Sequence, residues 1–100
     1  MIEKQIEYLK KRKANISCNG KTGILFFLES IGFSITNGKS EQHKIFSFKE
    51  LSMVTNGEFK TFSIDCGHYP NRPMKKNYII NIIRLLEKYE VYLLELNRDE

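Results

Sequence analysis

Apolar residues along this chain recur first at helical spacing, then in alternation, and finally at helical spacing again. Near the N-terminus, Ile2, Ile6 and Leu9 lie three or four positions apart, and four basic residues follow at 10–13. One apolar face and cations in the last turn are typical of an amphipathic helix, so we expect one over residues 2–13. Such a short stripe can dock on the domain or pair with another chain.

A second apolar stripe at residues 24–31 predicts a helix of about two turns. Thr22 is suited to cap the start of this helix, because its hydroxyl can accept a hydrogen bond from a free backbone N–H group. Gly32 is suited to end it, since glycine adopts the left-handed conformation that often stops a helix.

The middle of the chain alternates apolar and polar positions, which predicts strands. Strands are expected at residues 33–36, 43–48 and 59–65, with a tight hairpin at Asn37-Gly38. Residues 49–58 are expected to form a longer connection. Two successive hairpins give an antiparallel meander with one face covered by helices.

Strand parity assigns side chains to the two faces of this sheet. Phe46 and Phe48 are expected to lie under the helices, and Phe62 and Ile64 are the corresponding pair on the third strand. His43 then points to the opposite, uncovered face, near the hairpin. A ligand could reach it there.

The last third of the chain predicts a long helix. Pro73 suits its first turn, and the apolar stripe from Tyr78 to Tyr89 has helical spacing. Residues 91–96 are apolar enough to extend this helix or to form a short strand. Such a strand could pair with a partner.

The elements together predict a single α+β domain over residues 1–100. We expect a two-layer α-β-β-β-α sandwich at 22–89, with an extra N-terminal helix at 1–14 and a C-terminal extension at 90–100. The hydrophobic share of 41% and the charged share of 28% are those of a folded soluble protein. There is no signal-peptide pattern and no apolar run near the ~20 residues that span a bilayer, so we expect a cytoplasmic protein without a membrane partner.

The two cysteines, Cys18 and Cys66, belong to no CxxC pair and no Cys/His cluster. A zinc site is therefore not expected, and no other metal or cofactor is indicated. A disulfide between the two remains open. The favoured interpretation is two reduced thiols in a cytosolic protein.

The net charge of +4 favours anionic partners without identifying one. Its distribution is more informative, because Arg72, Lys75, Lys76 and Arg84 are interrupted by no acidic residue. The first three lie where the last helix begins, and helix N-termini bind phosphate through free N–H groups and the helix dipole. Lys39 and Lys44 of the hairpin are candidates for a second phosphate contact.

Three segments of the chain resemble the HicA-type toxins. These are the helix end Leu-Glu-Ser-Ile-Gly-Phe at 28–33, the Asn-Gly hairpin with its histidine at 37–46, and the lysine-containing helix entrance at 73–83. The resemblance extends from about Gly23 to Tyr89. It implies a fold like a double-stranded-RNA-binding domain, metal-independent cleavage of mRNA, a HicB-type antitoxin that blocks the RNA surface, and a catalytic role for His43.

Histidine suits this chemistry, because it titrates near neutral pH and can serve as base or acid when a 2′-OH attacks phosphorus. His68, the only other histidine, could complete an acid–base pair, although a loop residue beside phosphates is the favoured interpretation. Two alternatives to a nuclease remain. One is a noncatalytic RNA-binding domain. The other is a protein-interaction subunit, in a homo- or hetero-oligomer, that uses the Ile45 face, the N-terminal stripe and residues 91–96.

Overall fold

A computed structural model describes residues 2–12 and 15–98 of the chain. The elements in this part are α1 (Ile2–Arg12), α2 (Ile24–Ser30), β1 (Ser34–Asn37), β2 (His43–Ser47), α3 (Lys49–Val54), β3 (Thr61–Asp65), α4 (Lys76–Lys88) and α5 (Glu90–Leu96). The expected last residue of the first helix, position 13, lies outside the described residues. So do positions 1, 14, 99 and 100 of the expected segments.

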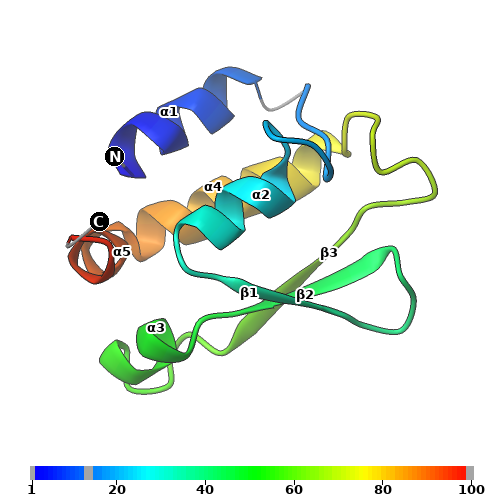
Figure 1. The fold of residues 1–100 in the computed structure, drawn as a ribbon. Coiled ribbons are helices and arrows are strands. Elements are labelled where there is room, and N and C mark those ends of the chain that lie inside the picture. Colours follow the sequence, from blue (N-terminus) through cyan, green and yellow to red (C-terminus); the bar gives the residue numbers. More distant parts are fainter. Residues whose placement is uncertain (1, 13–14, 99–100) are drawn as a thin grey trace.

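The three strands form an antiparallel sheet in the order β1-β2-β3. Helices α2 and α4 lie over one face of this sheet, and α1 lies on the side of these two helices remote from it (Figure 1). The expected α+β sandwich with an added N-terminal helix is therefore confirmed. None of the helices described is long and apolar enough to cross a membrane.

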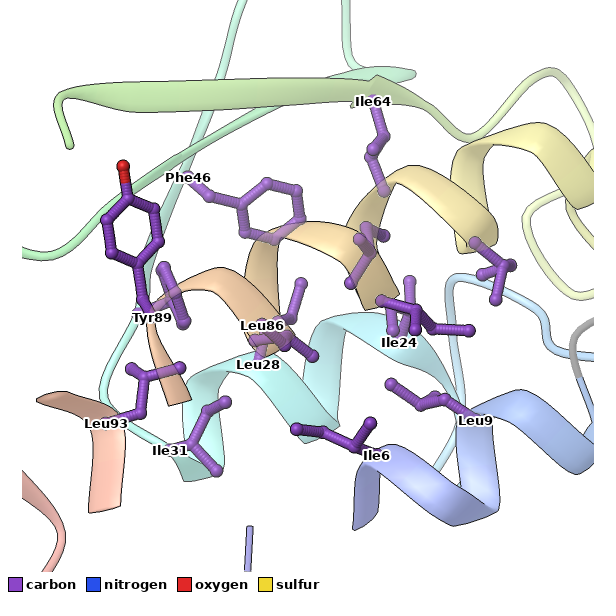
Figure 2. Close-up of a cluster of buried hydrophobic side chains, with 14 of the residues drawn as sticks. Ile6, Leu9, Ile24, Leu28, Ile31, Phe46, Ile64, Leu86, Tyr89 and Leu93 are labelled. Atoms are coloured by element: carbon purple, nitrogen blue, oxygen red, sulfur yellow. The ribbon is translucent and has the colours of Figure 1, made fainter. Parts of the chain in front are cut away.

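The core lies between the sheet and the helices. Ile35, Phe46 and Phe62 are register partners across the three strands, and the rings of Phe46 and Phe62 stack with centroids 4.7 Å apart. Phe46 and Ile64 point from the sheet toward the helix layer (Figure 2). The inward assignment of these side chains from strand parity is confirmed.

Helix α1 docks on its own domain. Ile2, Ile6 and Leu9 are buried, at 4%, 3% and 2% exposure. The Lys10 ammonium lies 2.6 Å from the carboxylate of Glu87 on α4. The apolar stripe of α1 is therefore used within the chain and does not offer a surface to a partner.

Helix α2 begins without the expected threonine cap. Gly23 is its N-cap residue, and no side chain caps the helix. The first N–H groups of α2 are bonded instead by the carbonyls of Ser17 and Cys18, at 2.8 and 3.1 Å. A Cβ atom on Gly23 would overlap the backbone of Asn19, so only glycine permits this approach. The carbonyls of Ser17 and Cys18 therefore accept the hydrogen bonds that we expected the Thr22 hydroxyl to accept.

Helix α2 ends as expected at Gly32, which has φ of +112°. The N–H of Gly32 donates to the carbonyl of Glu29, and the N–H of Phe33 donates to that of Leu28, at 3.1 and 3.0 Å. This pair of hydrogen bonds is the Schellman motif, which satisfies the last carbonyls of a helix. It also turns the chain toward β1.

Three expectations for the connections were wrong or incomplete. Residues 49–58 contain a helix, α3, which is anchored by the fully buried Leu51. Pro73 precedes α4, which starts at Lys76, because Pro73 forms an isolated bridge with Ser17 instead. The segment 91–96 belongs to helix α5, so the expected alternative of an added strand is excluded.

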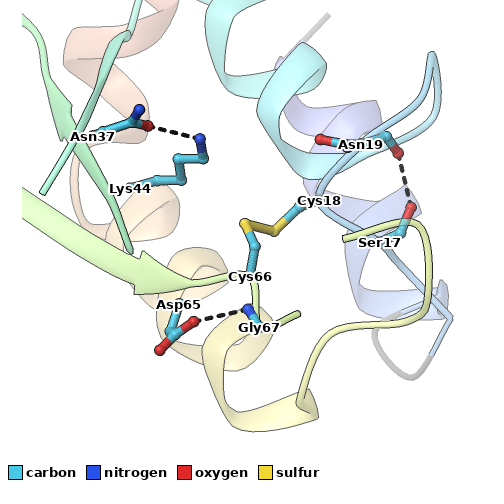
Figure 3. The surroundings of a disulfide bond; sticks show 8 residues. All are labelled: Ser17, Cys18, Asn19, Asn37, Lys44, Asp65, Cys66 and Gly67. Atoms are coloured by element: carbon cyan, nitrogen blue, oxygen red, sulfur yellow. Dashed lines mark hydrogen bonds between the residues drawn. A yellow bond between two sulfur atoms is a disulfide. The ribbon is translucent and has the colours of Figure 1, made fainter. Parts of the chain in front are cut away.

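The sulfur atoms of Cys18 and Cys66 form a disulfide across 48 positions of sequence (Figure 3). The interpretation of two reduced thiols is therefore wrong for this structure. Cys18 leads into α2 and Cys66 directly follows β3, so the two segments meet only in the folded chain. Nothing in the spacing of the cysteines could have revealed this contact.

Candidate nucleic-acid interface

The face of the sheet opposite α2 and α4 carries mostly short hydroxyl side chains. Strands alternate their side chains, so the residues facing away from Phe46 can be read from the register. They form two cross-strand rows around the half-buried Ile45: Ser34, Ser47 and Thr61, and then Thr36, Ile45 and Ser63. We call these six residues the hydroxyl face. Its members are exposed or half-buried.

His43 continues the hydroxyl face at the hairpin end of β2, on the uncovered side as expected. The imidazole packs against Gly38, where an added Cβ atom would overlap Nδ1. The backbone N–H of Lys39 donates to Nδ1 at 3.3 Å. In the neutral ring the proton then resides on Nε2, so this nitrogen is a hydrogen-bond donor. The hairpin loop thus fixes both the position and the tautomer of the ring.

Asp65 is the cross-strand partner of His43. Side chains in such a pair have Cβ atoms about 5 Å apart on the same face of the sheet. One carboxylate oxygen of Asp65 accepts a hydrogen bond from the N–H of Gly67 at 2.8 Å (Figure 3). Asp65 was not a candidate from the sequence, because finding it requires the register of β2 against β3.

Asp65 also lines a shallow surface pocket of about 300 Å³ between the end of β3 and the start of α4. Three of the residues proposed from the sequence line the same pocket, namely His68, Arg72 and Lys75. The structure therefore brings together one carboxylate, a second imidazole and two cations. Through Asp65, this pocket adjoins the position of His43.

The start of α4 adds to this surface. Lys75 is the N-cap residue of α4 and Lys76 is its first residue, and both side chains are exposed. No side chain caps this helix, so no side chain competes with an anion for the N–H groups of its first turn. Lys76 does not line the pocket, and its place is beside the pocket on the helix.

The two hairpin lysines, Lys39 and Lys44, lie in different surroundings. Lys44 faces the helix side of the sheet, where its ammonium bonds the side-chain oxygen of Asn37 at 2.7 Å (Figure 3). Because neighbouring residues of a strand point to opposite faces, Lys44 and His43 do not share one surface. Lys39 is exposed in the loop beside His43, and its backbone holds the imidazole.

The loop that carries His68 and Arg72 is attached to residues 16–19 at several points. The disulfide joins its first residue to Cys18. Farther along, the N–H of Asn19 donates to the carbonyl of Pro70 at 3.1 Å, and the N–H of Met74 donates to that of Ile16 at 2.8 Å. These contacts fix a loop that contains neither a helix nor a strand.

Within residues 2–12 and 15–98, no three His, Cys, Asp or Glu side chains are grouped so that they could hold a metal ion. The arrangement supplies proton donors and acceptors, cations and hydroxyl groups, which are the groups that bind phosphates and sugars.

No protein-family model matches the chain, and no curated protein or solved structure shows significant similarity to it.

Proposed function

We propose that this protein is a metal-independent endoribonuclease that cleaves mRNA, and that it is the toxin of a type II toxin–antitoxin system similar to HicA. The observation that carries the proposal is the position of His43. Its imidazole lies on the uncovered sheet face beside Asp65, which lines the same pocket as Arg72 and Lys75. A likeness to double-stranded-RNA-binding domains remains part of this proposal.

In this reaction the 2′-oxygen of a ribose attacks the adjacent phosphorus, and the bond to the 5′-oxygen of the next nucleotide breaks. The proton of the 2′-OH passes to a base, and the leaving 5′-oxygen takes a proton from an acid. His43 serves as the acid in its imidazolium form, which carries a proton on both ring nitrogens, and it is neutral after the transfer. The second carboxylate oxygen of Asp65 is the corresponding base. The products are a 2′,3′-cyclic phosphate and a 5′-hydroxyl end.

Binding in this proposal is electrostatic. Arg72 and Lys75 contact the phosphates on either side of the scissile bond, and Lys76 extends this contact along α4. Cations also stabilise the charge that develops on the phosphoryl oxygens during the reaction. His68 donates a hydrogen bond to a phosphate oxygen. No metal or other cofactor takes part.

The partner in this proposal is a HicB-type antitoxin that covers the RNA surface, and the compartment is the cytoplasm. Structural disulfides are rare there, because the thiol pool keeps cysteines reduced. A cytoplasmic toxin would therefore carry Cys18 and Cys66 largely as thiols. Its loop would still be attached to residues 16–19 through the backbone contacts of Asn19 and Met74.

The test is to incubate the purified protein with mixed RNA in EDTA, beside the variant His43→Ala. We expect wild type to produce fragments with 2′,3′-cyclic phosphate ends and the variant to bind RNA without cleaving it. Cleavage by His43→Ala would remove this residue from the mechanism. Binding without cleavage by wild type would indicate the noncatalytic RNA-binding domain, and neither activity would indicate the protein-interaction subunit.

A further inference from the structure

Tyr69 is an exposed aromatic residue in the middle of the basic loop, and the proposed reaction gives it no role. Its side chain is 65% exposed. It lines the pocket that also contains Asp65 and Lys75. Single exposed aromatic side chains are common on protein surfaces, so a role for Tyr69 has to be inferred from its neighbours in this pocket.

The local sequence explains how Tyr69 is held. Residues 69–72, Tyr-Pro-Asn-Arg, form a turn closed by a hydrogen bond of 2.9 Å from the N–H of Arg72 to the carbonyl of Tyr69. Pro70 suits the second position of such a turn, because its ring fixes φ. The carbonyl of Pro70 is in turn bonded by the N–H of Asn19. The turn is therefore attached to the body of the domain.

This turn places Tyr69 and Arg72 side by side. The guanidinium carbon of Arg72 lies 4.5 Å from the centroid of the Tyr69 ring, which is a cation–π contact. The pair presents two flat surfaces in the pocket that Asp65 and Lys75 also line. Unpaired bases of RNA stack on aromatic rings and on guanidinium planes, whereas bases inside a duplex are already stacked on their neighbours.

We propose that the Tyr69–Arg72 pair is a stacking site for one unpaired base of single-stranded RNA, next to the scissile phosphate. This inference rests on the proposed function and deepens it by assigning a base contact to a surface otherwise made of phosphate contacts. The ring is already held in place, so little side-chain freedom is lost when a base binds. Every base has a flat face, so the contact favours single strands without selecting a sequence strongly.

The test uses two 2′-O-methyl oligonucleotides of equal length, which cannot be cleaved through the 2′-oxygen. One carries bases, and the other is abasic throughout. Wild type, Tyr69→Phe and Tyr69→Leu are compared by fluorescence anisotropy. Leucine keeps much of the apolar surface but removes the flat ring, so it is the matched control for stacking.

We expect Tyr69→Phe to bind the base-containing strand within about twofold of wild type and Tyr69→Leu to bind it about tenfold more weakly. All three proteins should bind the abasic strand equally. Equal affinity of wild type and Tyr69→Leu for the base-containing strand would overturn the stacking site alone. An equal loss of affinity of Tyr69→Leu for both strands would also overturn it. Failure of wild type to bind either strand would overturn the proposed function together with the stacking site, whereas binding without cleavage of ordinary RNA would overturn only the nuclease.

Discussion

The imidazole of His43 packs directly on the backbone of Gly38, so closely that a Cβ atom at position 38 would overlap Nδ1. The contact joins the two ends of the hairpin loop, where the N–H of Gly38 also donates to the carbonyl of His43 at 2.7 Å. Gly38 thus determines where the proposed acid lies, although glycine itself has no side chain for catalysis.

Gly38→Ala should displace the imidazole while leaving the fold intact. Gly38 is not among the glycines with positive φ, so alanine introduces no backbone strain, and the half-buried ring must leave its position to make room for the new methyl group. We expect a thermal midpoint close to that of wild type and cleavage reduced by about a hundredfold, because small displacements of a reacting group have effects of this size. Ser40→Ala, in the same loop, is the control. Full activity in Gly38→Ala would show that this ring position is not needed.

Lys75 and Lys44 should respond differently to removal, because only Lys75 lines the pocket. Lys75 lines the pocket, whereas Lys44 bonds Asn37 on the helix side. Lys75→Ala should weaken RNA binding and reduce the slope of log affinity against log salt by about 0.7, the value for one lost contact with a single strand. Lys44→Ala should leave this slope unchanged. Titrations at several salt concentrations measure both slopes, and equal effects of the two variants would contradict a specific RNA contact at Lys75.

The disulfide should contribute strongly to stability. Closing a loop of 48 residues lowers the conformational entropy of the unfolded chain, which raises the free energy of unfolding by about 4 kcal/mol. Cys18→Ala with Cys66→Ala should lower the free energy of unfolding by up to this amount in urea titrations. A reducing agent should produce a similar loss in wild type and none in the double variant. An unchanged midpoint in wild type under reducing conditions would indicate that the bond does not form in solution.

Glu58 should make the stability sensitive to acid. The Lys88 ammonium, 3.1 Å from the carboxylate, and the Tyr89 hydroxyl, which donates to it at 3.0 Å, hold the pKa of Glu58 below its ordinary value. Because the pKa of Glu58 is lower in the folded protein than in the unfolded chain, its carboxylate stabilises the fold above pH 4.5. This stabilisation is lost as the pH falls through the pKa of the folded protein.

Wild type should therefore have a slightly higher thermal midpoint than Glu58→Gln at pH 7, and this difference should disappear as the pH falls below about 4.5. The effect is small, because both charged side chains are more than half exposed. Thermal melts at intervals between pH 7 and pH 3 measure it. A difference that stays constant over this range would exclude the carboxylate as its cause.

Much of the fold could be predicted because its signals are local. The alternation around Phe46 and the stripe of α4 each report burial within a few residues, and Gly32 marks a helix end by its own conformation. The features that could not be predicted depend on contacts between distant segments. Ser17 and Cys18 take over the cap expected from Thr22, and Ser17 also pairs with Pro73, so α4 begins later than expected.

The candidate site also contains residues that could be predicted from local sequence and residues that could not. His43 and the cations at 72–76 could be selected because their residue types and local positions suggest chemistry. Asp65 could not, because its proximity to His43 is a property of strand register. Lys44 was a candidate as a cation of the hairpin, and the alternation of side chains along β2 places it on the face opposite His43.

The covalent link between Cys18 and Cys66 encloses α2, all three strands of the sheet and α3 in a single ring of the polypeptide. A protease that cuts once inside this ring, for example at the exposed Lys39, leaves two fragments that remain tethered under non-reducing conditions. A nicked molecule would migrate as one species until thiol is added. The chain could therefore also be given new termini at this loop without releasing either half of the sheet.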